Sequence, residues 1–219
     1  MADAGSLKST TGVSLDAGRD LSRAALVLFF LLILSIAGCE RMMPLDTKPL
    51  DNAGMSYPAI KQLQTLNPTR AELAEVVKAR AAGFPDDGCI ELVRIYHSRN
   101  RPFSVGDTVA GLVKTRLRED TILQLARIDE LGINAGGLEL IRLAGFSDSM
   151  VLEVARHEAT GKTVFSGAAL STMRNAGIRE PVLLELVRRD IPDSEVPTII
   201  GLHRHGASDV DILRRYPGA

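Results

Sequence analysis

An all-α fold, built as an array of short two-helix repeats, is predicted by three regularities in the sequence. Apolar residues recur at helical spacing, four and seven positions before and six, seven and nine positions after a reference column. An acidic residue follows the column by three positions in every unit. The column itself, at spacings of 33, 29, 32 and 29 residues, consists of Gly83, Arg116, Gly145, Gly177 and Gly206. These regularities predict five units over residues 68–219, forming a compact bundle or a short α-solenoid.

The first helix of each unit lies before the reference column. Its apolar positions are Val76 and Ala79, Val109 and Leu112, Leu138 and Ile141, Leu170 and Met173, and Ile199 and Leu202. Glycine in the column adopts the positive φ that closes a helix without a steric penalty. Arg116 departs from glycine, so the sequence leaves open whether that turn has the same left-handed closure.

The second helix of each unit begins at the acidic residue. The acidic residues are Asp86, Glu119, Asp148, Glu180 and Asp209. A carboxylate in the first turn complements the helix dipole by about 0.3 to 1 kcal/mol, and the arginine eleven positions after the column does so near the helix end. Cys89 occupies a column that is otherwise apolar, which predicts a small buried residue and not a reactive thiol.

A longer period is visible as well, because Phe103-Ser104 and Phe165-Ser166 lie 62 residues apart. An apolar helix, then Ala-Gly-Phe-Ser-Asp in one copy and Ala-Gly-Ile-Arg-Glu in another, then a second apolar helix make up the pattern. It resembles helical repeats of about 60 residues found in uncharacterised bacterial proteins and covers residues 70–219. The resemblance concerns architecture and implies no catalytic residue. The last unit has Arg215 in a position that is Leu or Val in the preceding units, as expected for a terminal cap.

Residues 1–38 have the features of a signal peptide. Residues 24–38 contain no charge and are preceded by Arg19 and Arg23. As a helix this run spans about 22 Å, which is short of the ~30 Å hydrocarbon core, so a cleaved signal is favoured over a permanent span. The alternative is a single-pass membrane protein that retains residues 24–38.

The end of this segment, Ile36-Ala37-Gly38-Cys39, resembles the lipobox of bacterial lipoproteins. The resemblance implies cleavage after Gly38, diacylglycerol on the Cys39 thiol and acylation of the freed amine. Two or three chains make anchoring stable where one chain is marginal. It places the protein in a bacterial cell envelope, and Glu40 after the cysteine implies export to the outer membrane if the cell has one.

Residues 39–67 are expected to form a lipidated N-terminus and a flexible tether. They contain Pro44, Gly54 and Pro58 and show no sustained periodicity. The folded domain is therefore expected to begin near Asn67, at residue 68.

Composition excludes several classes of partner. The 219 residues have a net charge of -1, no Trp and 4% aromatic residues. A near-neutral chain has no long-range field for a polyanion, and it has few rings on which bases or sugars can stack. No phosphate-binding loop or nucleophile motif is present, so we expect neither a nucleic-acid partner nor a cofactor.

Candidate catalytic and metal sites receive a structural interpretation. A catalytic site needs groups that converge once, whereas the acidic column repeats in every unit, so we assign no catalytic residue. His203 and His205, considered with His157 and Asp209, are two positions apart and point to different faces of a helix. No metal site is therefore expected.

One charge cluster, formed by Arg94, His97, Arg99 and Arg101, is a candidate anion contact. Its arginines could bind a lipid phosphate or a wall polymer. The alternative is a solvated loop between repeats.

The sequence therefore predicts a membrane-tethered, non-enzymatic helical-repeat scaffold that binds other envelope proteins. One alternative is an envelope hydrolase or its accessory subunit, which would need a deep pocket lined by residues outside the repeated columns. A second alternative is a purely structural anchor.

Overall fold

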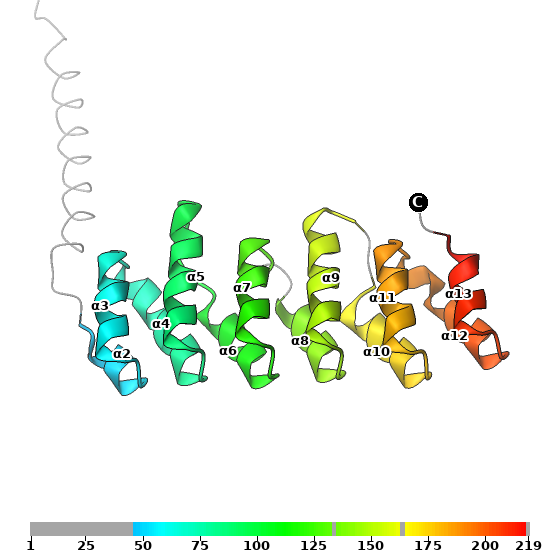
Figure 1. Ribbon diagram of the computed structural model, residues 1–219, viewed down its shortest axis with the longest axis horizontal. Coiled ribbons are helices and arrows are strands. Elements are labelled where there is room, and N and C mark those ends of the chain that lie inside the picture. Colours follow the sequence, from blue (N-terminus) through cyan, green and yellow to red (C-terminus); the bar gives the residue numbers. More distant parts are fainter. Residues whose placement is uncertain (1–45, 133–134, 163–164, 218–219) are drawn as a thin grey trace, which may run out of the picture. The chain divides into compact units, whose positions relative to one another are not determined.

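The architecture comes from a computed structural model that describes residues 46–132, 135–162 and 165–217. These residues form twelve α-helices and one short 3-10 helix and contain no strand. The prediction of an all-α repeat fold is confirmed. The helices alternate between two layers, and Figure 1 shows the second helices of the pairs side by side in one row.

The first helices of the pairs are α2 Lys48–Asn52, α4 Arg70–Ala81, α6 Gly106–Lys114, α8 Ala135–Leu143, α10 Gly167–Asn175 and α12 Val196–Arg204. The second helices are α3 Tyr57–Thr65, α5 Asp86–Ser98, α7 Glu119–Arg127, α9 Asp148–Ala159, α11 Glu180–Arg188 and α13 Asp209–Arg215. The 3-10 helix η1, Asp193–Glu195, precedes α12. Each first helix packs on the next first helix, and each second helix packs on the next second helix, as in a short α-solenoid.

The expectation of a flexible tether is wrong for residues 46–67, which form a sixth pair, α2 and α3. Leu50 and Leu63 are fully buried, and the two helices pack on α4 and α5. A five-residue helix is too short to show a 3.6-residue period. Proline is typical of a loop, but here it lies in the first turns of α2 and α3, where its missing N–H costs no hydrogen bond. Residues 39–45 of the expected tether lie outside the described residues.

The question left open at Arg116 is answered by its backbone, which has a φ of 63°. The N–H of Leu117 donates to the carbonyl of Leu112 at 3.1 Å, as the N–H of Phe84 does to Ala79 at 3.1 Å after Gly83. The turn therefore has the same left-handed closure as the glycine turns.

The core lies between the two layers. Phe84 and Phe146, directly after their turns, are buried, and so are Phe103 and Phe165 before α6 and α10. Cys89 is fully buried, and burial raises the pKa of its thiol to about 12. The expected burial of Cys89 is confirmed.

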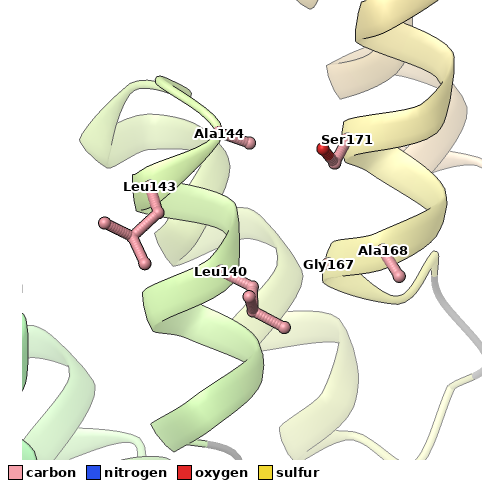
Figure 2. Close-up of a pocket in the computed structure, with 6 residues that line it drawn as sticks. All are labelled: Leu140, Leu143, Ala144, Gly167, Ala168 and Ser171. Atoms are coloured by element: carbon pink, nitrogen blue, oxygen red, sulfur yellow. The ribbon is translucent and has the colours of Figure 1, made fainter.

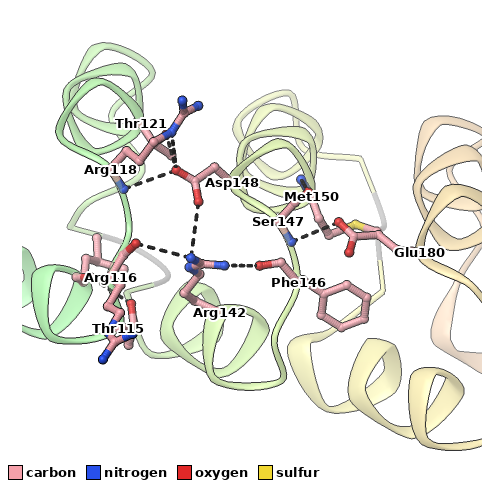
Figure 3. Close-up of polar contacts among 11 residues, drawn as sticks. Thr115, Arg116, Arg118, Thr121, Arg142, Phe146, Ser147, Asp148, Met150 and Glu180 are labelled. Carbon is pink, nitrogen blue, oxygen red and sulfur yellow. Dashed lines mark hydrogen bonds and ion pairs between the residues drawn. The ribbon is translucent and has the colours of Figure 1, made fainter.

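The acidic residue at the start of each second helix reaches back to the preceding pair (Figure 3). Asp148 accepts hydrogen bonds from the Arg118 N–H at 3.2 Å and from the Thr121 hydroxyl at 3.0 Å. Arg118 is the N-cap residue of α7, whose side chain makes no capping hydrogen bond of its own. Burial alone would raise the pKa of Asp148, but these hydrogen bonds and the charge of Arg142 lower it.

The same connection recurs along the array. Asp86 accepts the N–H of Ser56 at 3.0 Å, and Glu180 accepts the N–H of Ser147 at 2.9 Å. Asp209 instead accepts the Arg179 guanidinium Nε at 2.8 Å. The acidic column therefore lies in the first turn, as expected, and Asp86, Asp148 and Glu180 also accept the N-cap N–H of the preceding second helix, a contact that the sequence pattern does not predict.

Glu119 is the exception, because the N-cap of α5 is Pro85, which has no N–H to donate. Burial and the neighbouring charges of Asp120 and Asp87 raise the pKa of Glu119. The ionised carboxylate of Glu119 is thus disfavoured, at the position where the preceding N-cap residue, Pro85, offers no N–H.

Arginines on the first helices complete the connection. Arg142 donates to the carbonyls of Phe146 at 2.6 Å and Arg116 at 3.3 Å, and lies 3.8 Å from Asp148 (Figure 3). Arg80 donates to the Gly54 carbonyl at 2.7 Å and pairs with Asp86 at 2.7 Å. Each guanidinium therefore joins the turn of one pair to that of the pair before it.

A second ladder runs along the second helices. Arg127 donates to Glu91 at 3.1 Å, and Arg188 donates to Glu153 at 3.3 Å. Both arginines are about half exposed, so each pair contributes only about 0.2 to 1 kcal/mol. The two pairs nevertheless neutralise Glu91 and Glu153.

The Arg116→Gly variant should be more stable than the wild type by about 1 kcal/mol, because glycine adopts a positive φ without the penalty that a side chain incurs. Urea unfolding would measure the gain. The matched control is Gly145→Ala, at a φ of 83°, which should lower the free energy of unfolding. A loss of stability in Arg116→Gly would contradict the assigned closure.

The Asp148→Ala variant should lose about 1 to 3 kcal/mol at pH 7, because it leaves the α7 cap unsatisfied. Since the pKa of Asp148 is lowered in the folded state, its contribution is present above its unfolded pKa and disappears as the pH falls through the folded value. Urea titrations at several pH values would show the wild type converging on the variant.

The matched control is Glu119→Ala. Because the pKa of Glu119 is raised, its ionised form opposes folding, and its removal should leave stability unchanged or slightly increased at pH 7. Equal losses in the two variants would contradict the role given to the backward hydrogen bond.

Candidate protein-binding groove

An apolar groove lies between α8 and α10 (Figure 2). It is an open hollow of about 440 Å³, lined by Leu140, Leu143, Ala144, Gly167, Ala168 and Ser171. Leu140 projects from α8 toward α10, whereas Leu143 projects from the same helix away from α10. Leu140 is 53% exposed and Leu143 is 70% exposed, although most large apolar side chains of the described residues are buried. We call these six residues the α8–α10 groove.

The two leucines depart from the repeated columns. The residues equivalent to Leu140 are Lys78, Gly111, Thr172 and Gly201. Those equivalent to Leu143 are Ala81, Lys114, Asn175 and Arg204. Both columns face outward and are polar or small in the other units, so leucine at these positions serves no purpose in the core. Comparison of the equivalent positions identifies the two leucines in the sequence, but the search for regularly apolar columns does not.

Close packing of small residues shapes the floor of the groove. A Cβ atom added to Gly167 would lie 2.9 Å from the Gly137 carbonyl oxygen and 3.2 Å from the Leu140 Cβ atom. Glycine therefore allows the start of α10 to approach the backbone of α8. On the α10 side the groove is lined by the small side chains of Ala168 and Ser171, opposite Leu140 of α8.

The groove offers contact area and little chemistry. None of its six lining residues titrates, and its one side-chain hydroxyl belongs to Ser171. The hydrolase alternative called for a deep pocket with groups that converge on a substrate, and these lining residues do not provide such groups. What this arrangement can do is bury an apolar segment of another molecule.

The arginines of the candidate anion contact each have a partner within the chain. Arg94 pairs with Glu91 at 2.6 Å. Arg99 donates to the Ala126 carbonyl at 2.8 Å and also to that of Arg127, at the end of α7. Arg101 pairs with Asp129. The structure thus brings Arg99 and Arg101 together on Asp129 and keeps Arg94 apart, and anion binding there stays a prediction.

His97 of the same cluster belongs to a buried network. It lies 2.6 Å from Glu72, which is 2% exposed and also accepts the Phe103 N–H at 2.9 Å. Burial alone would raise the pKa of Glu72, but the hydrogen bonds from Thr69, Phe103 and His97 lower it. The network fixes the chain that leads into α6.

The histidines considered for a metal site each make a separate contact. His157 lies 2.6 Å from Asp190, at the end of α11. His205 lies 2.7 Å from the Gly201 carbonyl, and His203 faces Gly177. Within the described ranges, no group of three or more His, Cys, Asp or Glu residues could hold a metal ion.

The predicted lipidation site Cys39 and the cleavage motif Ile36, Ala37 and Gly38 lie outside the described residues. So does the apolar run 24–38. In the part of the chain that the structure describes, no helix is long and apolar enough to cross a membrane.

The two layers of paired helices and their outward groove define the class: an all-α helical-repeat protein. Comparison with protein-family models, curated proteins and solved structures found no match.

Proposed function

We propose that this protein is a membrane-tethered, non-enzymatic helical-repeat scaffold that binds other proteins of a bacterial cell envelope. The observation that carries the proposal is the α8–α10 groove, with Leu140 and Leu143 exposed in otherwise polar or small columns. Exposed apolar surface of this kind marks interaction sites in soluble domains.

The energetics favour a protein segment as the occupant. Burying a leucine side chain stabilises a complex by about 1.5 to 3 kcal/mol before the costs of association. Two adjacent leucines beside a wall of small residues can hold one or two apolar side chains of a peptide or helix. The regular packing of α6, α8, α10 and α12 extends the surface on both sides of the groove.

The anchor is proposed from the lipobox. Lipid on Cys39 would hold the array at a membrane, and the same holds if residues 24–38 are retained as a span. Tethering confines the scaffold to the region near the bilayer, which raises its effective concentration toward other anchored proteins.

Loss of the exposed leucines should abolish partner capture without unfolding the domain. A photo-crosslinkable residue at Ser171, at the wall of the groove, would be introduced with and without Leu140→Gln and Leu143→Gln. Crosslinked envelope proteins should disappear in the double variant, because the apolar contact is lost, while urea unfolding stays within about 0.5 kcal/mol of the parent.

The matched control is Val210→Gln, which changes a residue of α13 that is 62% exposed and distant in sequence from the groove. It should retain every crosslink. Recovery of the same partners from the double leucine variant would contradict the assignment of the groove.

The anchor has its own test, the intact mass and N-terminal peptide of protein from membrane fractions. The wild type should give a lipid-bearing peptide that begins at Cys39, and Cys39→Ala should lose the lipid and the cleavage. An unmodified chain that retains residues 24–38 would contradict lipidation and favour the single-pass alternative.

A further inference from the structure

The N-terminal pair of the array lacks the groups that would join it to another pair. In the positions of the joining arginine and acidic residue, this pair has Asp51 and Tyr57. Neither side chain can make the backward contacts that Arg80 and Asp86 make to this pair. This pair is the first in the part of the chain that the structure describes, and no described helix precedes it on the outer side of α2 and α3.

The first residue of α3 is an exposed aromatic residue. Tyr57 is 71% exposed, the largest fraction among the exposed large apolar side chains of the described residues. The Lys61 ammonium group lies over its ring, 5.4 Å from the centroid, one helical turn further on. An aromatic ring with a polar tip beside a flexible lysine suits a surface that is part apolar and part wet.

The opposite end of the array is closed differently. Ser208 and Asp211 form a capping box on α13, with the Ser208 N–H donating to Asp211 at 3.2 Å. The N-cap N–H groups of α3, α7 and α9 donate to a carboxylate of the following pair, whereas that of α13 donates to a carboxylate of its own helix. The two ends are thus chemically distinct.

The length of chain before the N-terminal pair limits its distance from the membrane. Asp46, the first described residue, is seven positions after Cys39, and at up to 3.6 Å per residue these positions reach no further than about 25 Å. The chain leaves the bilayer near Cys39 whether that residue is lipidated or residues 24–38 remain as a span. Because residues 46–67 are folded and do not form a tether, the array begins no further than about 25 Å from Cys39.

We propose that the N-terminal pair rests on the membrane that anchors the protein, with Tyr57 and Lys61 of α3 in the lipid headgroup region. The proposal rests on the membrane anchoring proposed above. Tyrosine is enriched at this depth, where its ring meets the edge of the hydrocarbon and its hydroxyl stays in water. The exposed charges of this pair, Asp46, Asp51, Lys48 and Lys61, balance, so the contact depends on the ring more than on anionic lipid.

The absence of tryptophan from the sequence permits a direct test. Tyr57→Trp would place a unique fluorophore at the proposed contact, and Val210→Trp, also at an exposed position, would place one on α13 at the other end. Each full-length variant, purified from membranes, would be reconstituted into phosphatidylcholine vesicles whose acyl chains carry bromine near the headgroup. Flotation of the vesicles would report anchoring in the same sample.

The expected result is that both variants float, that the emission of position 57 shifts to the blue and is quenched by the brominated lipid, and that position 210 shows neither change. Addition of Lys61→Ala should reduce the quenching at position 57. Floating protein without quenching at position 57, or with equal quenching at both positions, would overturn the inference and leave the anchor intact. Failure to float would overturn the anchor and the inference with it.

Discussion

A carboxylate that reaches backward to the preceding pair holds successive repeats in register. Asp148 shows its full form, accepting a backbone N–H of the α7 cap while Arg142 joins its own turn to the carbonyl of Arg116. Such hydrogen bonds are directional, so they specify the position of one pair on the next more closely than apolar burial, which is non-directional. The helices are too short to be stable alone, so this register adds to the apolar packing, although α6 and α7 pack on the preceding pair without it.

The ion pairs also show which part of the surface is free of polar contacts between repeats. At the turns, acidic residues and arginines satisfy one another, and along the second helices Arg127 and Arg188 neutralise Glu91 and Glu153. Leu140 and Leu143, on the outward face of α8, take no part in either set of contacts. The groove is therefore a local departure from a regular array, which is the kind of feature that function adds to a fold.

The ends of the array connect the fold to its proposed location. The N-terminal pair is folded, so the link between the array and Cys39 is shorter than the proline content suggests. In our proposal Tyr57 of this pair contacts the anchoring membrane. A scaffold held this close to the bilayer would present its groove to partners within a narrow layer. Its partners are then expected among proteins that share that layer, because tethering raises the effective concentration for such proteins alone.

Local periodicity was enough to predict the all-α class, the paired helices from residue 70 onward and the burial of Cys89, since each depends on residues within one or two turns. It could not identify the five-residue helix α2, because so short a segment shows no period. It also could not assign the partner of Asp148, which lies 30 residues earlier in the chain. The exposure of Leu140 and the closure at Arg116 were likewise decided by the tertiary structure. The exposure of Leu140 depends on which surface the neighbouring helices cover, and the closure at Arg116 depends on a non-glycine residue adopting a positive φ, which the local pattern does not predict.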